Sequence, residues 1–313
     1  MRFRLKASAK EALAAYIFLL PNLAGFLVFT SIPVIASLVL SFVRWDILSP
    51  PQFVGFDNFI RLLGFSIKDG VFKFNDPLFW KYTKNTLFLM MVIPLNMIGA
   101  LAIALALNKK IRGIVIFRTV YFLPTISSGV AIAILWKWMY NSDIGLLNNL
   151  IVSIGGLFGA DWHGPNWLTS TAWAKPALMF MGFWTMVGGY NMILYLAALQ
   201  GIPRELYEAA DMDGASGWRK FLAVTWPMIS PTTFFIAIMS TIGGFQSGFM
   251  QAYIMTGGGP NGATTTVEYY IFNNLYTYQH AGYAASIAWV LFMAIFAVTL
   301  LNWRFGGKLV QYY

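Results

Sequence analysis

The stretch YEAADMDGASGWRKFLAVTWPMISP, residues 207–231, is polar and dense in charge, and it lies inside an otherwise strongly apolar chain. It contains two short helix-forming segments separated by Gly214, a residue that readily adopts the left-handed conformation in which helices end. Pro203 suits the first turn of the first segment, and Ser216 can cap the second. The pattern predicts a helix, a tight turn and a second helix.

The rest of the chain has the composition of a bilayer protein. Hydrophobic residues make up 58% of the 313 residues and charged residues only 11%, whereas soluble globular proteins hold about 25% charged residues. Uncharged runs of roughly 20 residues are long enough to cross the hydrocarbon core of a membrane. We therefore expect an all-α membrane protein in which residues 1–313 form a single transmembrane domain. Six transmembrane helices are predicted, at about residues 12–42, 85–107, 119–136, 176–200, 227–250 and 284–303.

Orientation is predicted from Lys and Arg, which are enriched on the cytoplasmic side of membrane proteins. With the N-terminus inside, the inner segments hold 13 of the 21 basic residues, and the outer segments hold the other eight over more than twice the length. Both termini and the loop at about 203–226 are therefore expected in the cytoplasm. The basic residues lie at membrane boundaries and not in one patch, so nucleic-acid binding is not expected.

The residue types needed for chemistry are missing from the predicted spans. None of them contains Asp, Glu, His, Lys or Arg, the side chains of proton relays and intramembrane enzymes. The chain has no cysteine and no phosphate-binding loop of the G-x-x-x-x-G-K type. We therefore predict no catalytic residue, no metal site and no cofactor. Energy for uphill transport would have to come from another subunit.

The charged stretch resembles the EAA loop found in permease subunits of ATP-binding-cassette (ABC) importers. The resemblance is carried by Glu208-Ala209-Ala210, Asp213-Gly214-Ala215, the apolar Phe221 and Val224, and the prolines Pro227 and Pro231. Its place between the fourth and fifth of six predicted spans matches as well. Val224 stands where the family usually has isoleucine, and Trp226 stands where leucine commonly precedes the proline.

Segments near both ends of the chain resemble carbohydrate-uptake permeases of the maltose and glycerol-3-phosphate type. They are Ser41-Phe42, Trp45-Asp46, residues 53–59, Asp76-Pro77, Phe79-Trp80, Asn85-Thr86, residues 256–260 with 263–266, and residues 282–286. The glycine run in 256–260 is also expected to be a flexible turn. Together these segments cover nearly the whole length of the chain.

The resemblance implies the type I ABC importer permease fold, with a cytoplasmic coupling helix, in the cytoplasmic (inner) membrane of a bacterium. It also implies four kinds of partner: a second homologous permease, two ATP-binding-cassette ATPase subunits, an extracytoplasmic solute-binding protein and a carbohydrate substrate. The chain itself would be a non-catalytic permease embedded in membrane lipid. Contact with the ATPase would fall on Glu208, Ala209, Ala210, Asp213 and Gly214.

Solute recognition is expected in the fourth and fifth spans, which carry aromatic and polar side chains suited to sugar rings and hydroxyl groups. The candidates are Trp184, Tyr190, Asn191, Thr241, Gly244, Phe245, Gln246 and Gln251. For Tyr190 and residues 241–245, the resemblance to maltose-type permeases also implies a place in the lining of the cavity. The same side chains could instead bond or pack against neighbouring helices. Within the importer class, a peptide or a phosphorylated polyol is an alternative solute. A channel is a further alternative, although neither a charged ring nor a repeated filter is present.

Overall fold

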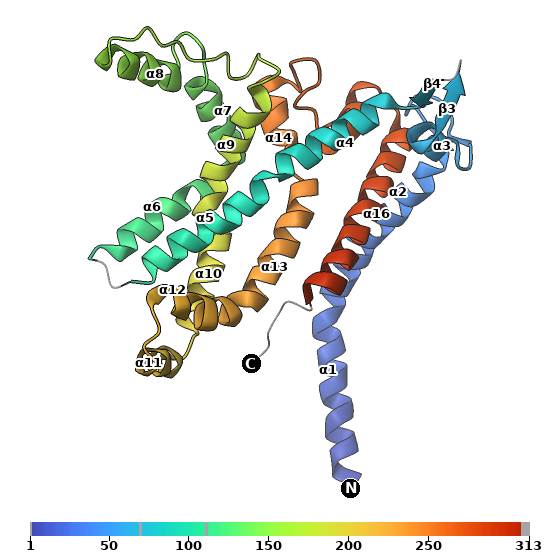
Figure 1. The fold of residues 1–313 in the computed structure, drawn as a ribbon. Helices are drawn as coiled ribbons and strands as arrows, with labels where there is room; N and C mark the ends of the chain where they lie inside the picture. Colours follow the sequence, from blue (N-terminus) through green and yellow to red (C-terminus); the bar gives the residue numbers. More distant parts are fainter. Residues whose placement is uncertain (1, 69–70, 110–111, 308–313) are drawn as a thin grey trace. The chain divides into compact units, whose positions relative to one another are not determined.

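The computed structural model describes residues 2–68, 71–109 and 112–307, which are mostly helical (Figure 1). The helices are α1 (Arg2–Phe26), α2 (Ile32–Ser41), α3 (Asp57–Leu63), α4 (Pro77–Met90), α5 (Val92–Leu107), α6 (Ile114–Ile126), α7 (Gly129–Met139), α8 (Leu146–Leu157), α9 (Ala174–Val187), α10 (Tyr190–Gln200), α11 (Arg204–Met212), α12 (Gly217–Lys220), α13 (Trp226–Phe245), α14 (Phe249–Gln251), α15 (Val267–Phe272) and α16 (Ala281–Gly306). Four π-helical turns are η1 (Leu27–Ser31), η2 (Phe221–Thr225), η3 (Ala252–Thr256) and η4 (Asn273–Thr277). The strands are β1 (Val43–Arg44), β2 (Gln52–Phe53), β3 (Phe65–Lys68) and β4 (Val71–Phe74).

The chain divides into two compact units. One unit holds the residues up to Asp76 together with Ile271–Val290. The other holds Pro77–Tyr270 together with the residues from Leu291 onward. Each unit is described separately below.

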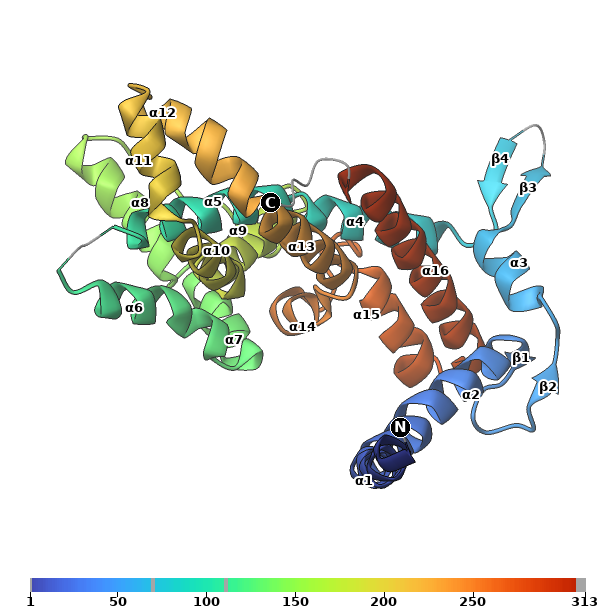
Figure 2. The same cartoon turned by 90° about the horizontal axis from the view of Figure 1, so that it is seen from below.

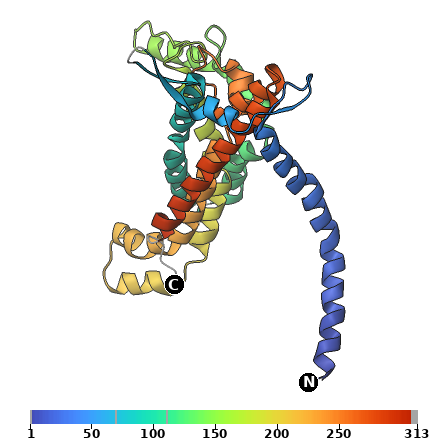
Figure 3. The same cartoon turned by 90° about the vertical axis from the view of Figure 1, so that its right-hand side faces the viewer.

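The first unit begins with a long helical segment formed by α1, η1 and α2 in succession (Figure 3). Beyond it, β1 pairs with β2 and β3 pairs with β4, both antiparallel. The indole of Trp289 donates a hydrogen bond of 3.2 Å to the Ser37 hydroxyl. The Tyr283 hydroxyl donates to the Asp76 carboxylate, and the Arg61 guanidinium lies 4.5 Å from the centre of the Tyr283 ring.

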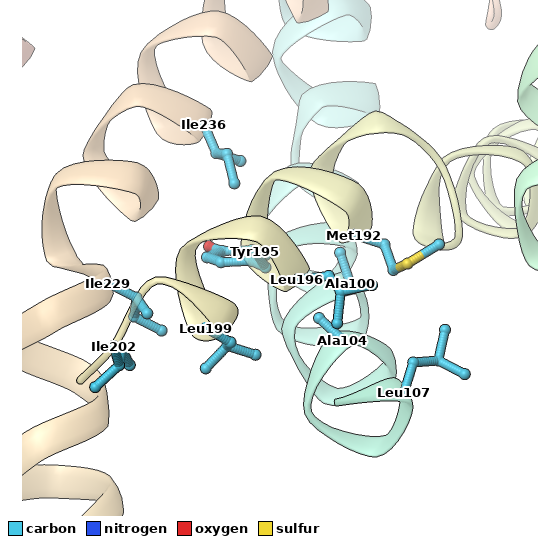
Figure 4. Packing of buried hydrophobic residues seen from close by; sticks show 10 residues of the cluster. All are labelled: Ala100, Ala104, Leu107, Met192, Tyr195, Leu196, Leu199, Ile202, Ile229 and Ile236. Carbon is cyan, nitrogen blue, oxygen red and sulfur yellow. The ribbon is translucent and has the colours of Figure 1, made fainter. Parts of the chain in front are cut away.

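The core of the second unit forms where α5, α10 and α13 meet (Figure 4). Small residues on α5, Ala100 and Ala104, are fully buried and let α10 approach closely. Larger side chains from α10 and α13 fill the remaining space. The buried cluster comprises Ala100, Ala104, Leu107, Met192, Tyr195, Leu196, Leu199, Ile202, Ile229 and Ile236.

Within the second unit, α11 and α12 lie at the end opposite α8 (Figure 1). Five helices in the described part of the chain are long and apolar enough to cross a membrane: Ala9–Ser41, Pro77–Leu107, Ala174–Gln200, Gly217–Phe245 and Ala281–Arg304. The helix pair Ile114–Ile126 and Gly129–Met139 makes a sixth if it counts as one span.

The third predicted span differs most from expectation. Residues 119–136 were expected to form one transmembrane helix, but α6 and α7 meet at an angle of 96°. Figure 2 shows these two helices from below. The helix stops at Ser127, whose backbone is extended, and α7 begins after Ser128, whose backbone is also not helical. Pro124 lies in the last turn of α6 and removes a backbone donor there.

Candidate functional site

The turn between α11 and α12 has the conformation predicted from its sequence. Gly214 has a φ of 70°, in the left-handed region. The N–H of Ala215 donates to the Ala210 carbonyl at 2.9 Å, and the N–H of Gly214 donates to the Asp211 carbonyl at 3.0 Å. These two bonds define a Schellman motif, which satisfies carbonyl groups at the end of a helix.

The second helix is also capped as predicted. Ser216 is extended, and its hydroxyl accepts a hydrogen bond of 3.4 Å from the Arg219 N–H. Two further contacts, which the sequence did not reveal, join α11 to α12 and to η2, which follows it. Lys220 Nζ lies 2.6 Å from Asp211 Oδ1, and the Tyr207 and Thr225 hydroxyl groups are 2.9 Å apart.

The residues predicted to contact the ATPase lie on the solvent-exposed surface of this turn. Glu208, Ala209, Asp213 and Gly214 are exposed, and Ala210 is half-buried. Among the described residues, Glu208 forms no ion pair, whereas the neighbouring Asp211 is paired with Lys220. The turn, held by the contacts to Lys220 and Thr225, thus exposes a carboxylate that is unpaired among the described residues, beside small side chains, a surface that suits a basic partner.

A cavity of about 350 Å³ lies in the second unit, a size within the range of about 300–1,000 Å³ typical of small-molecule sites. Its wall combines apolar side chains, hydroxyl groups, amides and glycines. The lining residues are Thr86, Leu89, Met90, Val92, Ile93, Asn96, Thr125, Thr185, Met186, Gly189, Tyr190, Asn191, Met239, Ser240, Gly243, Gly244, Ser247, Gly248 and Thr266.

Helix breaks in three candidate spans meet at this cavity. The segment Pro77–Leu107 is interrupted at Met91, next to the lining residues Met90 and Val92. Pro94 explains this break, because its ring lacks the N–H that would bond the Met90 carbonyl. The segment Ala174–Gln200 is interrupted at Gly188 and Gly189, and the α6–α7 break follows the lining residue Thr125.

The Gly188-Gly189 pair allows close packing against α6. A Cβ atom on Gly188 would stand 2.3 Å from the Tyr121 carbonyl oxygen. A Cβ atom on Gly189 would stand 2.5 Å from Thr125 Oγ1. The pair therefore breaks the helix and lets α6 approach the break closely.

Three of the eight predicted solute contacts line the cavity: Tyr190, Asn191 and Gly244. The Tyr190 ring is 65% exposed and meets Phe122 edge-on, with ring centres 5.6 Å apart. Asn191 Nδ2 donates to the Ser240 hydroxyl at 3.3 Å. A Cβ atom on Gly244 would stand 2.8 Å from Ile93, so this glycine keeps α13 close to α5.

The other five predicted contacts lie outside the cavity wall. The Trp184 ring packs edge-on against Trp136, with ring centres 5.5 Å apart. The Thr241 hydroxyl donates to the Ala237 carbonyl of its own helix at 2.7 Å, and Phe245 is buried. Gln246 follows the last residue of α13, and Gln251 belongs to α14.

Sequence reasoning missed the wall contributed by the second and third spans. Asn96 and Thr125 line the cavity, but both lie in apolar stretches for which only a transmembrane helix was predicted. A polar residue within an uncharged span was the available signal. Ser240 was missed as well, although it is one residue before the candidate Thr241.

The glycine-rich segment is more restrained than the expected flexible turn. The Thr265 hydroxyl donates to the Gly258 carbonyl at 3.1 Å. The amide of Asn85 on α4 donates to the carbonyls of Gly262 and Thr265, both at 2.9 Å. The side chains of Thr264, Thr265 and Thr266 are buried. Hydrogen bonds thus fix this segment beside α4.

Glu268 follows the glycine-rich segment, outside the candidate spans. Burial raises the pKa of its carboxyl group above the ordinary value, while a hydrogen bond from the Phe249 N–H opposes that shift. The bond measures 3.3 Å and reaches the start of α14. Among the described residues, no group of three or more His, Cys, Asp or Glu side chains could hold a metal ion.

A second cavity, of about 660 Å³, lies in the first unit. Several of its polar side chains are bonded within that unit. Asn58 Nδ2 donates to the Ser41 and Val43 carbonyls, and Arg44 faces Asp57 at 3.6 Å. Two hydrogen bonds from Ser49 lower the pKa of the exposed Asp46 below its ordinary value.

These features define a class: a helical membrane protein in which interrupted apolar helices line a cavity within one unit, and a helix-turn-helix lies at one end of that unit. Residues 96–304 match the family of binding-protein-dependent transport system inner membrane components. The chain belongs to this family.

Related proteins support the assignment over nearly the full length. The chain is 34% identical over 307 residues to the probable ABC transporter permease protein YesP of Bacillus subtilis strain 168. This alignment covers 97% of this chain and 93% of YesP. It is also 37% identical over 294 residues to the lactose transport system permease protein LacF of Rhizobium radiobacter. That alignment covers 92% of this chain and 92% of LacF.

The fold matches that of a solved transporter subunit. A chain in the crystal structure of a bacterial alginate ABC transporter, in complex with an alginate pentasaccharide-bound periplasmic protein, superposes with a TM-score of 0.82. The two chains are 23% identical, and the match covers 98% of this chain and 99% of the other. This confirms the predicted type I importer permease fold.

Proposed function

We propose that this chain forms one half of the membrane pathway of an ABC importer for a sugar or oligosaccharide. A second, homologous permease would form the other half, two cytoplasmic ATPases would supply energy, and an extracytoplasmic binding protein would deliver the solute. The observation that carries this proposal is the cavity at which three helix breaks meet. Broken helices around a central site are a common feature of membrane transporters.

A saccharide suits the cavity wall. Sugars present apolar ring faces and hydroxyl groups, and the wall offers the exposed Tyr190 ring next to the Asn191 amide and the Ser240 hydroxyl. The names of relatives agree: lactose, arabinooligosaccharides, diacetylchitobiose and trehalose/maltose are the stated solutes of four of them. The solute of this chain would belong to the same chemical class.

Coupling to the ATPases would occur through the turn between α11 and α12. Glu208 would pair with a basic residue in a groove of the ATPase, and Ala209 and Ala210 would let the groove approach. Asp213 and Gly214 would hold the turn. Closure of the ATPases on ATP would then shift the permease from one conformation to another. The reason is that a binding partner shifts a conformational equilibrium toward the state that it binds more tightly.

This role requires residues 203–226 and both termini to lie in the cytoplasm. The excess of Lys and Arg on that side supports the orientation. Replacement of Glu208 by lysine should abolish solute-coupled ATP hydrolysis by the assembled transporter and leave membrane insertion intact. Normal coupling in that variant would refute the proposed contact.

Uptake by the assembled transporter tests the cavity. Tyr190→Ala should lower the rate or the apparent affinity of sugar uptake, because it removes the exposed ring from the wall. Tyr16→Ala is a matched control, since Tyr16 is 71% exposed on α1 and does not line the cavity. Equal uptake by the Tyr190→Ala variant and the unaltered protein would remove Tyr190 from the solute pathway.

A further inference from the structure

Four lysines lie at the end of the second unit that is opposite α11 and α12. Lys81 and Lys84 are near the start of α4, Lys137 is in the last turn of α7, and Lys175 is the second residue of α9. Figure 1 shows that these three helix ends lie at the same end of the unit as α8. These four side chains are called the lysine cluster below.

Two members of the lysine cluster bond a segment that begins and ends at the cavity wall. Lys81 Nζ donates a hydrogen bond to the Asn261 carbonyl, and Lys137 Nζ donates one of 2.9 Å to the Ile254 carbonyl. Both carbonyls belong to residues 249–265, and the residue before this segment and the residue after it line the cavity. The lysine cluster therefore lies beside a segment that is anchored in the cavity wall.

The other two members lie close to Lys81. Lys84 follows Lys81 by three positions on α4, so both face the same side of that helix. Lys175 Nζ lies 5.2 Å from the centre of the Phe88 ring, which is one further turn along this side. The charges of Lys81 and Lys175 are near enough to repel each other. Three positive charges thus share the side of α4 that meets the start of α9.

No carboxylate forms an ion pair with the lysine cluster in the part of the chain that the structure describes. Helices α4, α7 and α9 and residues 249–265 contain neither Asp nor Glu. Glu268, three residues after that segment, accepts a hydrogen bond from the Phe249 N–H. Like charges that lie together without a counter-charge repel each other, so binding of an anion at the lysine cluster is favourable.

We propose that the lysine cluster binds the negative charges of an acidic oligosaccharide and guides it into the cavity, so that the solute of this importer is acidic. This inference rests on the proposed function, because the solute reaches the cavity from this end only if α11 and α12 lie in the cytoplasm. Lys and Arg are depleted outside the cytoplasm in most membrane proteins, yet the cluster holds four of the eight basic residues expected there. Binding of an acidic solute accounts for lysines where orientation alone disfavours them.

The spread of the charges favours a chain of acidic sugars over a single charged group. Lys81 and Lys137 bond the carbonyls of different residues, 261 and 254, so the positive charge is distributed along the segment. An ammonium group has three donors, so each of these lysines keeps donors for a solute. One phosphate ester is a single anionic group, whereas every uronate residue of an oligosaccharide carries its own carboxylate. An oligosaccharide can therefore engage several members of the cluster together.

Phospholipid headgroups are the other anions expected at the ends of transmembrane helices. The negative surface potential that attracts basic residues is that of the cytoplasmic leaflet, and the lysine cluster lies at the opposite end in the proposed orientation. The hydrogen bonds of Lys81 and Lys137 also direct these side chains toward the segment beside the cavity. Both observations favour a solute over a lipid.

An electrostatic role predicts the size and the salt dependence of the effect. A site lined by one sign of charge speeds association with an oppositely charged solute by about 10- to 1,000-fold, and the gain falls steeply as ionic strength rises. The double variant Lys84→Gln, Lys175→Gln removes two of the four charges and keeps the backbone bonds of Lys81 and Lys137. It should slow uptake of an acidic oligosaccharide by about 10-fold at low ionic strength, and high salt should remove the difference.

The test measures uptake by the assembled transporter of short oligosaccharides of galacturonate, glucuronate and mannuronate, and of the neutral oligosaccharides made by reducing their carboxyl groups. The double glutamine variant should lose uptake of the acidic solutes only. The double variant Lys84→Arg, Lys175→Arg should behave as the unaltered protein, because it keeps both charges. Lys109→Gln is the matched control, since Lys109 is exposed at the other end of the candidate span that holds Lys84, and it should change nothing.

Four results would contradict this account. Unchanged acidic uptake in the double glutamine variant, or an equal loss of acidic and neutral uptake, would make the lysines structural or lipid-anchoring residues and overturn the proposal. Uptake of glucose phosphate without uptake of any uronate oligosaccharide would overturn it as well. Uptake of neutral saccharides alone by the unaltered transporter would overturn the acidic solute and leave the proposed function standing. Uptake of no saccharide, acidic or neutral, with lactose and trehalose included, would instead contradict the proposed function.

Discussion

Replacing Gly214 by alanine should loosen the turn that joins α11 to α12. Gly214 has a φ of 70°, and no atom lies within 4 Å of the place where a Cβ atom would stand. The added methyl group therefore strains the backbone without a clash. A left-handed conformation costs an L-residue roughly 1–2 kcal/mol, which would lower the ratio of closed to open turn by about 5- to 30-fold.

Hydrogen exchange measures this ratio. The Ala215 N–H donates to the Ala210 carbonyl only while the turn is closed, so its protection should fall by the same factor of about 5- to 30-fold if the turn opens locally. Mass spectrometry of the peptide that contains Ala215 reports the change. Solute-coupled ATP hydrolysis should fall in the same variant, because the proposed ATPase contact depends on the turn.

Gly217→Ala is the control for this experiment. Gly217 begins α12, lies outside the left-handed region and also has no atom within 4 Å of a Cβ position. The same chemical change three residues away should leave both exchange at Ala215 and coupled hydrolysis unchanged. Equal effects of the two substitutions, or no effect of Gly214→Ala on exchange, would refute the reasoning from backbone conformation.

Three further predictions concern packing, hydrogen bonding and pH. Gly188→Ala should destabilise the protein by about 1–3 kcal/mol, because the methyl group would clash with the Tyr121 carbonyl. Gly182→Ala is the control and should not destabilise it, because nothing lies within 4 Å of a Cβ position there. Thermal unfolding of both variants measures the difference, and equal unfolding temperatures would argue against the clash. Tyr207→Phe should cost about 1 kcal/mol through loss of the bond to Thr225. Thermal unfolding of the two single variants and the double variant measures this bond. The loss of stability in the double variant Tyr207→Phe, Thr225→Val should be smaller than the sum of the two single losses, and full additivity would argue against the bond. Burial raises the pKa of Glu268 in the folded state, so the folded protein retains its proton to a higher pH, and stability should fall as pH rises from the unfolded pKa to the folded one. Glu268→Gln should flatten this part of the unfolding-temperature profile, and an unchanged slope would count against the assignment.

Local signals explain why the turn at Gly214 was predictable. A left-handed stop and a Ser216 cap depend on residues within a few positions of one another, and the structure has both. The bonds from Tyr207 to Thr225 and from Asp211 to Lys220 join residues 18 and nine positions apart. Such pairs depend on how the second helix packs against the first, which local patterns do not specify.

The cavity was only partly predictable for a similar reason. Tyr190 and Asn191 were identified from residue type within a span, and the resemblance to maltose-type permeases also implied Tyr190 and Gly244. All three line the wall. Asn96 and Thr125 were missed, although they also line the wall. The faces of α5 and α6 that line the cavity are set by contacts between residues far apart in the sequence, which local patterns do not specify. Gln246 was expected within the fifth span, at about 227–250, and Gln251 directly after it, but α13 ends at Phe245.

Labelling of a single cysteine can test whether the cavity is a solute pathway driven by ATPase partners. The chain contains no cysteine, so Ser240→Cys places one thiol in the wall of the cavity. In the assembled transporter, an impermeant thiol reagent added outside should react faster in the ATP-bound state than without nucleotide, and a transported sugar should slow that reaction. A labelling rate that responds to neither nucleotide nor sugar would contradict the proposed pathway.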